Sequence, residues 1–229
     1  MDKPVSRPPR PDERVYAAIY DAVQAHRLEP GVKLKEVELT DMFKVSRTSV
    51  RTALLRLSQK GLLEIVPNRG AVVAKPSAED CRQIFESRLA IESMVVEVLA
   101  RSADPAAVKS LRQHARAQQR AFEAGKVEEG QRLAIAFHRL LASHCGNRIL
   151  AQFLDDLLSR MPLIILTHGT GRTADDATHA DHLDLVEAIA DRNVVRARRI
   201  LEQHLKALQD ELDLDTQKDP KTLKQMLQR

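Results

Sequence analysis

Residues 28–74, LEPGVKLKEVELTDMFKVSRTSVRTALLRLSQKGLLEIVPNRGAVVA, decide the fold of the first third of this chain. Apolar residues recur at three- and four-residue spacing in residues 36–43 and again from residue 47 to Gly61, which predicts two short helices. Ser46 is a suitable N-cap for the second helix, because its hydroxyl can accept a hydrogen bond from a backbone N–H without a partner in the helix. A further helix is expected before them, from Asp12 to the Glu-Pro-Gly sequence that starts at residue 29.

The residues after Gly61 have the composition of a β-hairpin. The segments LLEIV (62–66) and AVVAK (71–75) are apolar and β-branched, and they flank the turn sequence Pro-Asn-Arg-Gly at 67–70. A hairpin of this size is not stable alone in water, so it must pack against the three helices. This order of elements predicts a winged helix-turn-helix over residues 12–75, preceded by a loose arm at residues 1–11.

A winged helix-turn-helix predicts DNA binding, because the first turns of its recognition helix reach base edges in the major groove. Arg47 and Arg51 are four residues apart on one helix face and are suited to bidentate contacts with guanine. Residues suited to phosphate or minor-groove contacts are Lys44, Thr48, Ser49 and Arg69. The alternative is that these arginines form an ordinary solvated helix face. The charge distribution favours DNA, because residues 1–76 carry 14 Lys and Arg against 9 Asp and Glu.

The same stretch resembles the N-terminal domain of GntR-superfamily regulators, whose pattern runs rLxPGxxLxExxLAxxxgVSRtPVReALxxLxxeGLvxxxpxrGaxV. The resemblance covers roughly residues 12–75. Ser49 and Thr52 stand where the family usually has proline and glutamate. The resemblance implies that Arg47, Thr48 and Arg51 read the DNA, and that Arg69 and Gly70 form the tip of the wing.

The remainder of the chain has only helical periodicity. Ser77 with Asp80 resembles a capping box at the start of a new helix, and Asp104-Pro105 has the composition of a helix start. Further breaks divide the segment into six or seven helices, which predicts an all-α antiparallel bundle over residues 76–212 and a polar tail at 213–229. The fold class is therefore mainly α, with an N-terminal winged helix and a C-terminal bundle.

Three histidines in the bundle are candidate metal ligands. His182 and His204 belong to consecutive helices and lie at similar heights, roughly 15–18 Å from the turn between them at 1.5 Å per residue. They can face each other, and His138 on an earlier helix can complete a three-nitrogen site suited to zinc or nickel. Each histidine taken alone is more often a packed or surface residue. His179 and Asp181 are near in sequence, but their helix-face angles differ from that of His182.

The segments AFHRLLASHCGNRIL and HLDLVEAIADRNVVRARRILEQHL resemble the FCD-type ligand domain of the FadR subgroup. The resemblance implies a metal held by one Asp and three His, with an effector, often a small organic acid, bound against it. Ala134 stands where that aspartate is expected, so the site either relies on three histidines or is empty. Arg88 matches a family arginine that points to the effector cavity, the alternative being a surface salt bridge with Glu92. Asn147 either lines the cavity or caps a helix.

These features predict a repressor released by a small organic acid. It is expected to act as a homodimer on a pseudo-palindromic double-stranded DNA site, because a two-fold protein matches a two-fold sequence. A metal-sensing regulator with the same fold and a three-histidine hydrolase are the alternatives, but no HExxH motif supplies a general base for the hydrolase. Two scattered cysteines, no leader and no long apolar run predict a cytoplasmic protein without a membrane partner.

Overall fold

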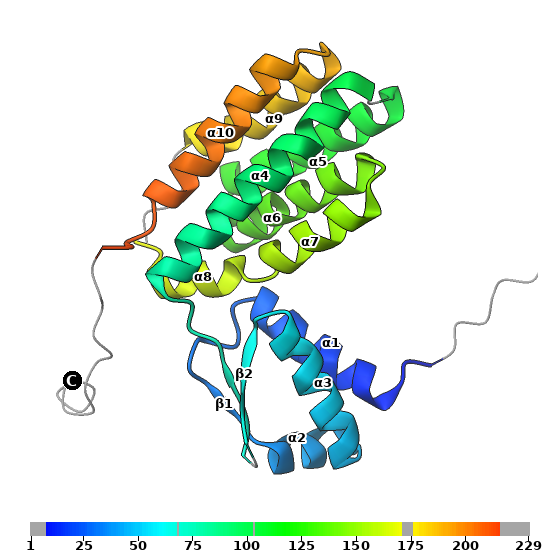
Figure 1. The fold of residues 1–229 in the computed structure, drawn as a ribbon, viewed down its shortest axis with the longest axis vertical. Helices are drawn as coiled ribbons and strands as arrows, with labels where there is room; N and C mark the ends of the chain where they lie inside the picture. Colours follow the sequence, from blue (N-terminus) through cyan, green and yellow to red (C-terminus); the bar gives the residue numbers. More distant parts are fainter. Residues whose placement is uncertain (1–7, 68, 103, 171–175, 216–229) are drawn as a thin grey trace, which may run out of the picture.

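The computed structural model describes residues 8–67, 69–102, 104–170 and 176–215, with the side chains of 176–180 left out. The chain forms two packed bodies, a small N-terminal one and a larger helical one (Figure 1). Most of the arm predicted at 1–11 and of the tail at 213–229 lies outside the described residues. The mainly α fold class is confirmed. The elements are α1 (Pro11–Gln24), β1 (Lys33–Leu34), α2 (Glu36–Phe43), α3 (Arg47–Gln59), β2 (Leu63–Val66), β3 (Gly70–Val73), α4 (Ala78–Ser102), α5 (Pro105–Glu123), α6 (Val127–His144), α7 (Arg148–Leu158), α8 (Met161–His168), α9 (Asp176–Ala190) and α10 (Val194–Asp210).

The N-terminal body is a winged helix in which α1, α2 and α3 pack on a small antiparallel sheet. The hairpin predicted after Gly61 is present as β2 and β3, but the sheet has a third strand, β1, and the strand order is β1-β3-β2. The two-stranded wing was therefore incomplete as a prediction. β1 pairs Lys33 with Val72 and Leu34 with Ala71, which ties the segment after α1 to the wing.

Gly70 makes this third strand possible. Its φ is +110°, and a Cβ built there would lie 2.1 Å from the backbone oxygen of Leu34. Only a residue without a side chain can therefore start β3 so close to β1.

The C-terminal body consists of α4 to α10, which gives seven helices within the described residues. Its helix starts follow the sequence signals. Ser77 and Asp80 cap α4 reciprocally, with the Asp80 backbone N–H donating to Ser77 Oγ at 3.0 Å and the Ser77 N–H donating to Asp80 Oδ2 at 2.9 Å. Asp104 caps α5 through the N–H of Ala107. The core between these helices contains Phe137, Leu141, Leu154 and Leu201, all at most 1% exposed.

The two bodies share apolar and polar contacts at α8, which lies at their junction (Figure 1). Leu163 of α8 is fully buried and belongs to the core of the winged helix. Gln24 of α1 donates to the backbone oxygen of Ser159 at 2.9 Å, and Arg160 donates to the backbone oxygen of Lys60 at 3.0 Å. The helical body is thus attached to both α1 and the end of α3. None of the helices in the described ranges combines the length and apolar character needed to cross a bilayer.

Candidate DNA-binding surface and metal centre

The first turn of α3 presents the residues predicted to contact DNA. Ser46 caps the helix as expected, with its Oγ accepting from the Ser49 backbone N–H at 3.1 Å. Arg47 and Thr48 are exposed at the helix start, and Ser49 is partly buried, with its hydroxyl 2.9 Å from Ser46 Oγ. Lys44 is exposed in the turn before α3, in a left-handed conformation with φ of 54°. These side chains lie at the end of α3 that a recognition helix turns toward base pairs.

A hollow of about 540 Å³ separates α3 from the wing, and its charged lining is predominantly basic. Arg47 and Arg51 approach it from α3, and the exposed Arg69 approaches it from the β2–β3 turn. Gly70 is buried and supports the wing through its contact with Leu34, so its place in the structure is not that of an exposed DNA contact. The residues that line the hollow are Lys33, Lys35, Glu36, Val37, Arg47, Arg51, Val66, Arg69, Ala71 and Val72.

Glu36 is a residue that the sequence did not single out. It is the first residue of α2, and both its carboxylate oxygens accept from Arg51 Nε, at 2.9 and 3.0 Å. The two residues are 15 positions apart on different helices, so no helical spacing rule could have paired them.

The structure brings together the three histidines that the sequence predicted. His138 on α6, His182 on α9 and His204 on α10 each place a ring nitrogen within 4.8 Å of the others. The Nε2 atoms of His182 and His204 are 3.1 Å apart. All three side chains are at most 3% exposed, and Phe137 stacks on the His182 ring with 4.1 Å between centroids. The histidines therefore form one buried, converging cluster.

Each histidine contacts an oxygen atom through its Nδ1 atom. The Nδ1 atom of His138 donates to Glu92 Oε2 at 2.5 Å, and that of His182 donates to Gln118 Oε1 at 2.6 Å. The Nδ1 atom of His204 lies 3.3 Å from Asp181 Oδ2. Such partners fix the ring orientation and the tautomer of metal-binding histidines. Asp181, which the helix-face angle argued against as a ligand, thus contacts the cluster through His204, while His179 lies outside the described side chains.

This arrangement fits a divalent cation. Because every Nδ1 faces an acceptor oxygen, the proton of each neutral ring is placed on Nδ1, and Nε2 carries a lone pair. Two lone pairs 3.1 Å apart repel each other unless a shared proton or a cation lies between them. Two ligands of a tetrahedral zinc ion are separated by about 3.3 Å for Zn–N bonds of about 2.0–2.1 Å. Burial lowers the pKa of His138, which keeps its ring in the neutral form that binds metals.

Arg88 differs from both sequence-based expectations. It pairs with Glu92, four residues on, with Nε 2.8 Å from Oε1, but both side chains are only 2% exposed. The surface salt bridge was therefore right in its partner and wrong in its environment. Burial alone would raise the pKa of Glu92, but the hydrogen bond from His138 Nδ1 and the positive charge of Arg88 outweigh burial and lower that pKa, so the carboxylate stays ionised. Arg88 also contacts Met161 Sδ at 3.5 Å, at the start of α8.

Asn147 is exposed and caps α7. Its Oδ1 accepts from the backbone N–H groups of Ile149 and Leu150, both at 3.1 Å. Of the two alternatives, the structure therefore supports the helix cap, and this exposed side chain does not line a cavity in the helical core.

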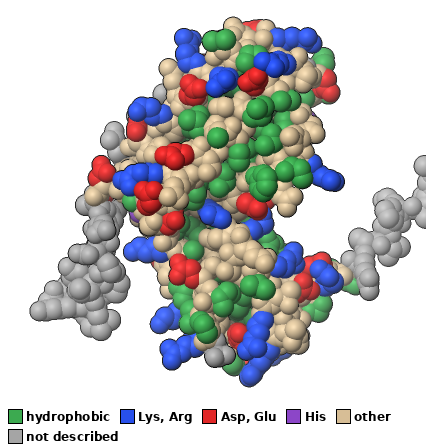
Figure 2. Space-filling view, in the orientation of Figure 1, with side chains coloured by type: hydrophobic (Ala, Val, Ile, Leu, Met, Phe, Trp, Pro, Cys, Tyr) green, Lys and Arg blue, Asp and Glu red, His purple; other side chains and the backbone are tan. Residues whose placement is uncertain are grey.

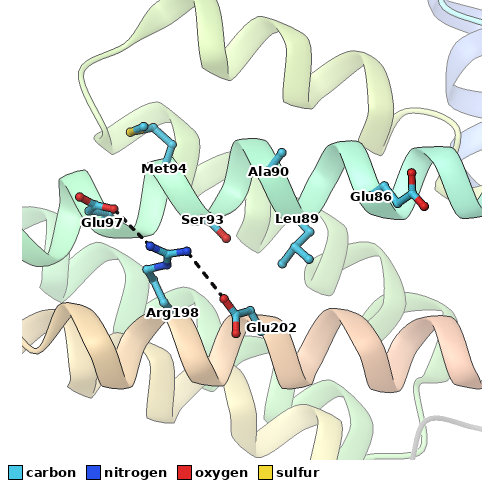
Figure 3. Close-up of a pocket in the computed structure, with 8 residues that line it drawn as sticks. All are labelled: Glu86, Leu89, Ala90, Ser93, Met94, Glu97, Arg198 and Glu202. Atoms are coloured by element: carbon cyan, nitrogen blue, oxygen red, sulfur yellow. Dashed lines mark ion pairs between the residues drawn. The ribbon is translucent and has the colours of Figure 1, made fainter.

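A groove of about 430 Å³ lies on the surface between α4 and α10 (Figure 3). Arg198 projects into it between Glu97 and Glu202 and pairs with both, at 3.7 and 3.9 Å. The Arg198 guanidinium is thus already paired with two carboxylates. None of the three clustered histidines is among the residues that line it.

Both halves of the chain match known families. Residues 11–73 match the bacterial regulatory proteins of the gntR family, and residues 83–207 match the FCD domain. The HTH-type transcriptional repressor RspR of Escherichia coli (strain K12) is 25% identical over 199 residues, which is 87% of each protein. The HTH-type transcriptional repressor GlaR of the same organism is 29% identical over 186 residues, covering 77% of this chain and 84% of its own.

Solved structures show the same fold. A putative GntR transcriptional regulator from Rhodococcus sp. RHA1 superposes with a TM-score of 0.76 at 22% identity, over 87% of this chain and 95% of its own. McbR/YncC of E. coli superposes with a TM-score of 0.76 at 20% identity, over the same shares of the two chains.

Proposed function

The chain belongs to the GntR family of bacterial regulators with a C-terminal FCD domain, and we propose that it is a repressor released by a small organic acid. Membership makes it a DNA-binding transcription regulator and not an enzyme, which removes the three-histidine hydrolase. The names of RspR and GlaR, both called repressors, favour repression over activation. A regulator of this kind acts on the chromosome, so a cytoplasmic location remains part of the proposal.

The observation that carries the proposal is the buried cluster of His138, His182 and His204, each held from behind by an oxygen acceptor. Three neutral imidazoles suit zinc or nickel. Such an ion would supply positive charge and an open coordination position to the core of the domain. Ala134 is partly buried on the same helix as His138 and offers no ligand atom. A carboxylate of the effector can take the coordination position that the family aspartate would fill.

The existing ion pair of Arg88 also favours the metal ion as the group that binds the effector carboxylate. Its guanidinium is paired with Glu92 in a dry environment, so a carboxylate effector would have to displace an existing ion pair to reach it. A metal ion is the better anion-binding group here. We therefore assign Arg88 to holding Glu92, and assign the effector carboxylate to the ion.

The route from this site to the DNA-binding surface passes through two helices. Glu92 and Arg88 lie on α4, which begins at Ala78, directly after the linker from β3. Arg88 also contacts Met161 on α8, whose Leu163 is part of the winged-helix core. Effector binding that moves Glu92 would thus act on α4, which follows the linker from the winged helix, and on α8, which packs against the winged helix. The effector need only bind one arrangement of the two bodies better than the other.

We also propose that the protein is a homodimer, and exposed apolar side chains on the helical body support this. Leu89 and Met94 on α4, with Ile149 and Phe153 on α7, are 37–57% exposed, and apolar side chains gather over these helices in Figure 2. Exposed apolar patches of this kind mark protein interfaces. Two copies joined here would present two α3 helices to a pseudo-palindromic site. Phe153→Glu is expected to give monomers in light scattering, and an unchanged dimer mass would place the interface elsewhere.

The proposal is tested with a DNA duplex selected by the protein from a random library. Anisotropy with the labelled duplex is measured on chelator-treated, zinc-loaded and nickel-loaded protein, with and without a panel of small carboxylates. We expect an acid to weaken binding at least about tenfold, within the usual range of coupling energies, and only in the loaded protein. His204→Ala should abolish the response, whereas His144→Ala, an exposed histidine at the end of α6, should retain it.

Two outcomes change the proposal. An acid response that survives in His204→Ala places the effector away from the cluster. A response to metal alone, with no further effect of any acid, supports the metal-sensing regulator instead.

A further inference from the structure

Arg51, one of the two arginines expected to read bases, is held by a carboxylate of the neighbouring helix. Its Nε atom lies 2.9 Å from Oε1 and 3.0 Å from Oε2 of Glu36. The Glu36 side chain is 17% exposed against 61% for Arg51, so the carboxylate is the more sheltered partner. Glu36 opens α2, where the helix dipole favours a negative charge. The Glu36 carboxylate is therefore the sheltered end of the pair, and the Arg51 side chain is the accessible end.

This pairing leaves donors for DNA. An arginine has five N–H donors, and only the one on Nε is used by Glu36. Within the part of the chain that the structure describes, Nη1 and Nη2 of Arg51 make no hydrogen bond or ion pair. Bidentate recognition of guanine requires two donors, for O6 and N7. Arg51 can thus keep its contact with Glu36 while it binds guanine.

Arg47 provides the contrast. It lies one turn earlier on α3, lines the same hollow, and is exposed. Its side chain makes no hydrogen bond or ion pair with any of the described residues. Arg47 must therefore lose rotamer freedom when it binds DNA, whereas the Arg51 side chain is already restricted.

We infer that Glu36 is a specificity-determining residue, which positions the Arg51 guanidinium for one guanine and repels phosphate groups from the same place. The inference rests on the proposed DNA-binding function. Among the described residues that line the hollow, Glu36 is the one carboxylate beside five lysines and arginines. Its charge weakens binding to every DNA sequence, because most of the affinity comes from phosphate contacts. The loss is offset only where Arg51 meets a guanine, so Glu36 lowers affinity and raises selectivity.

The test compares Glu36→Gln with Glu38→Gln, which removes the same charge from the same turn of α2. Glu38 is 60% exposed and pairs with Lys35 rather than Arg51. Each variant and the unaltered chain select duplexes from a library with 20 random base pairs. Affinities for the best duplex and for a scrambled duplex are then measured by anisotropy, and circular dichroism verifies that each variant is folded.

We expect Arg51→Lys to lose the preference for one guanine, which identifies the position that Arg51 reads. At that position the preference of Glu36→Gln for guanine should fall about tenfold, the scale of one bidentate base contact. Its affinity for the scrambled duplex should rise. Glu38→Gln should gain affinity for the scrambled duplex and keep the guanine preference. In the Arg51→Lys background, Glu36→Gln should have no further effect on selectivity.

Three results would overturn the inference. Glu36→Gln and Glu38→Gln could behave alike, which would reduce Glu36 to a general charge. Glu36→Gln could lose a preference for cytosine at another position, which would mean that the carboxylate itself reads a base. It could also lower selectivity equally with and without Arg51. If the unaltered chain selects no sequence at all, the proposed DNA-binding function fails, and the inference fails with it.

Discussion

Replacing Glu92 by glutamine tests whether the helical core depends on a buried ion pair. Glu92 Oε1 is 2.8 Å from Arg88 Nε, its Oε2 is 2.5 Å from His138 Nδ1, and the Glu92 side chain is 2% exposed. Glutamine keeps the shape and one acceptor oxygen but removes the charge. The Arg88 guanidinium is then left in a dry environment without a counter-charge. Breaking such a pair costs about 3–5 kcal/mol.

Two matched variants separate this cost from other effects. Glu187 pairs with Arg112 at 2.7 Å, but these side chains are 47% and 31% exposed, so Glu187→Gln should cost no more than about 1 kcal/mol. The double variant Arg88→Met with Glu92→Gln removes both buried charges. It should recover most of the stability, because a neutral buried pair has no uncompensated charge.

The chain offers separate probes for its two bodies. It has no tryptophan, and its two tyrosines, Tyr16 and Tyr20, both lie on α1 of the winged helix. Tyrosine fluorescence therefore follows the winged helix and its junction with the helical body, because the Tyr20 hydroxyl lies 3.2 Å from Ser159 Oγ and accepts from Arg139 Nη2 at 3.1 Å. Circular dichroism is dominated by the larger helical body. Glu92→Gln should lower the urea midpoint seen by circular dichroism more than the midpoint seen by tyrosine fluorescence. The reasoning is refuted if Glu92→Gln costs no more than Glu187→Gln, or if the double variant is less stable than Glu92→Gln.

Three further changes test the junction and the wing by the same two probes. Leu163→Ala should cost about 2–5 kcal/mol, because Leu163 is fully buried, and should separate the fluorescence transition from the dichroism transition; coincident transitions would contradict its linking role. Gly70→Ala should destabilise the winged helix by more than the about 1–3 kcal/mol of backbone strain alone, since its Cβ would meet the Leu34 oxygen; an unchanged midpoint would contradict the close approach of β1. Burial alone would raise the pKa of Asp155, but Lys60 helps to lower this pKa overall. The ionised Asp155 therefore stabilises the fold above the ordinary pKa of about 4, and this stabilisation is lost as pH falls through the lower pKa of the folded state. The difference in midpoint between the unaltered chain and Asp155→Asn should therefore shrink in acid, and a difference that grows in acid would contradict this sign.

Much of the fold was predictable because local signals agreed with one another. Ser46, Ser77 and Asp104 cap helices where the sequence placed helix starts, since a capping side chain acts within three residues of itself. β1 was not predictable. It has two residues, too few for an alternating pattern, and it exists only because Gly70 lets β3 approach it.

The candidate metal site was predictable in its ligands and not in their partners. Helix periodicity and length placed His182 and His204 at one height, but the oxygens behind them come from other elements or from a different helix face. Gln118 is 64 residues from His182, and Glu92 is 46 residues from His138. The Arg88 and Glu92 spacing predicted their pairing, but spacing is the same for a solvated pair and a buried one. Burial is decided by the helices that pack over α4, which local sequence does not reveal.

The contacts at the junction differ in how easily they can change, and this difference bears on how a signal would cross it. Removing Leu163 from the winged-helix core would cost about 2–3 kcal/mol of apolar burial. The hydrogen bonds from Gln24 to Ser159 and from Arg160 to Lys60 are partly exposed and contribute only about 1 kcal/mol each, because water can replace them. A ligand that supplies a coupling energy of about 1–3 kcal/mol can exchange such bonds more readily than it can extract the leucine. A ligand of that coupling energy is therefore expected to rearrange polar contacts of the junction while Leu163 stays in the winged-helix core.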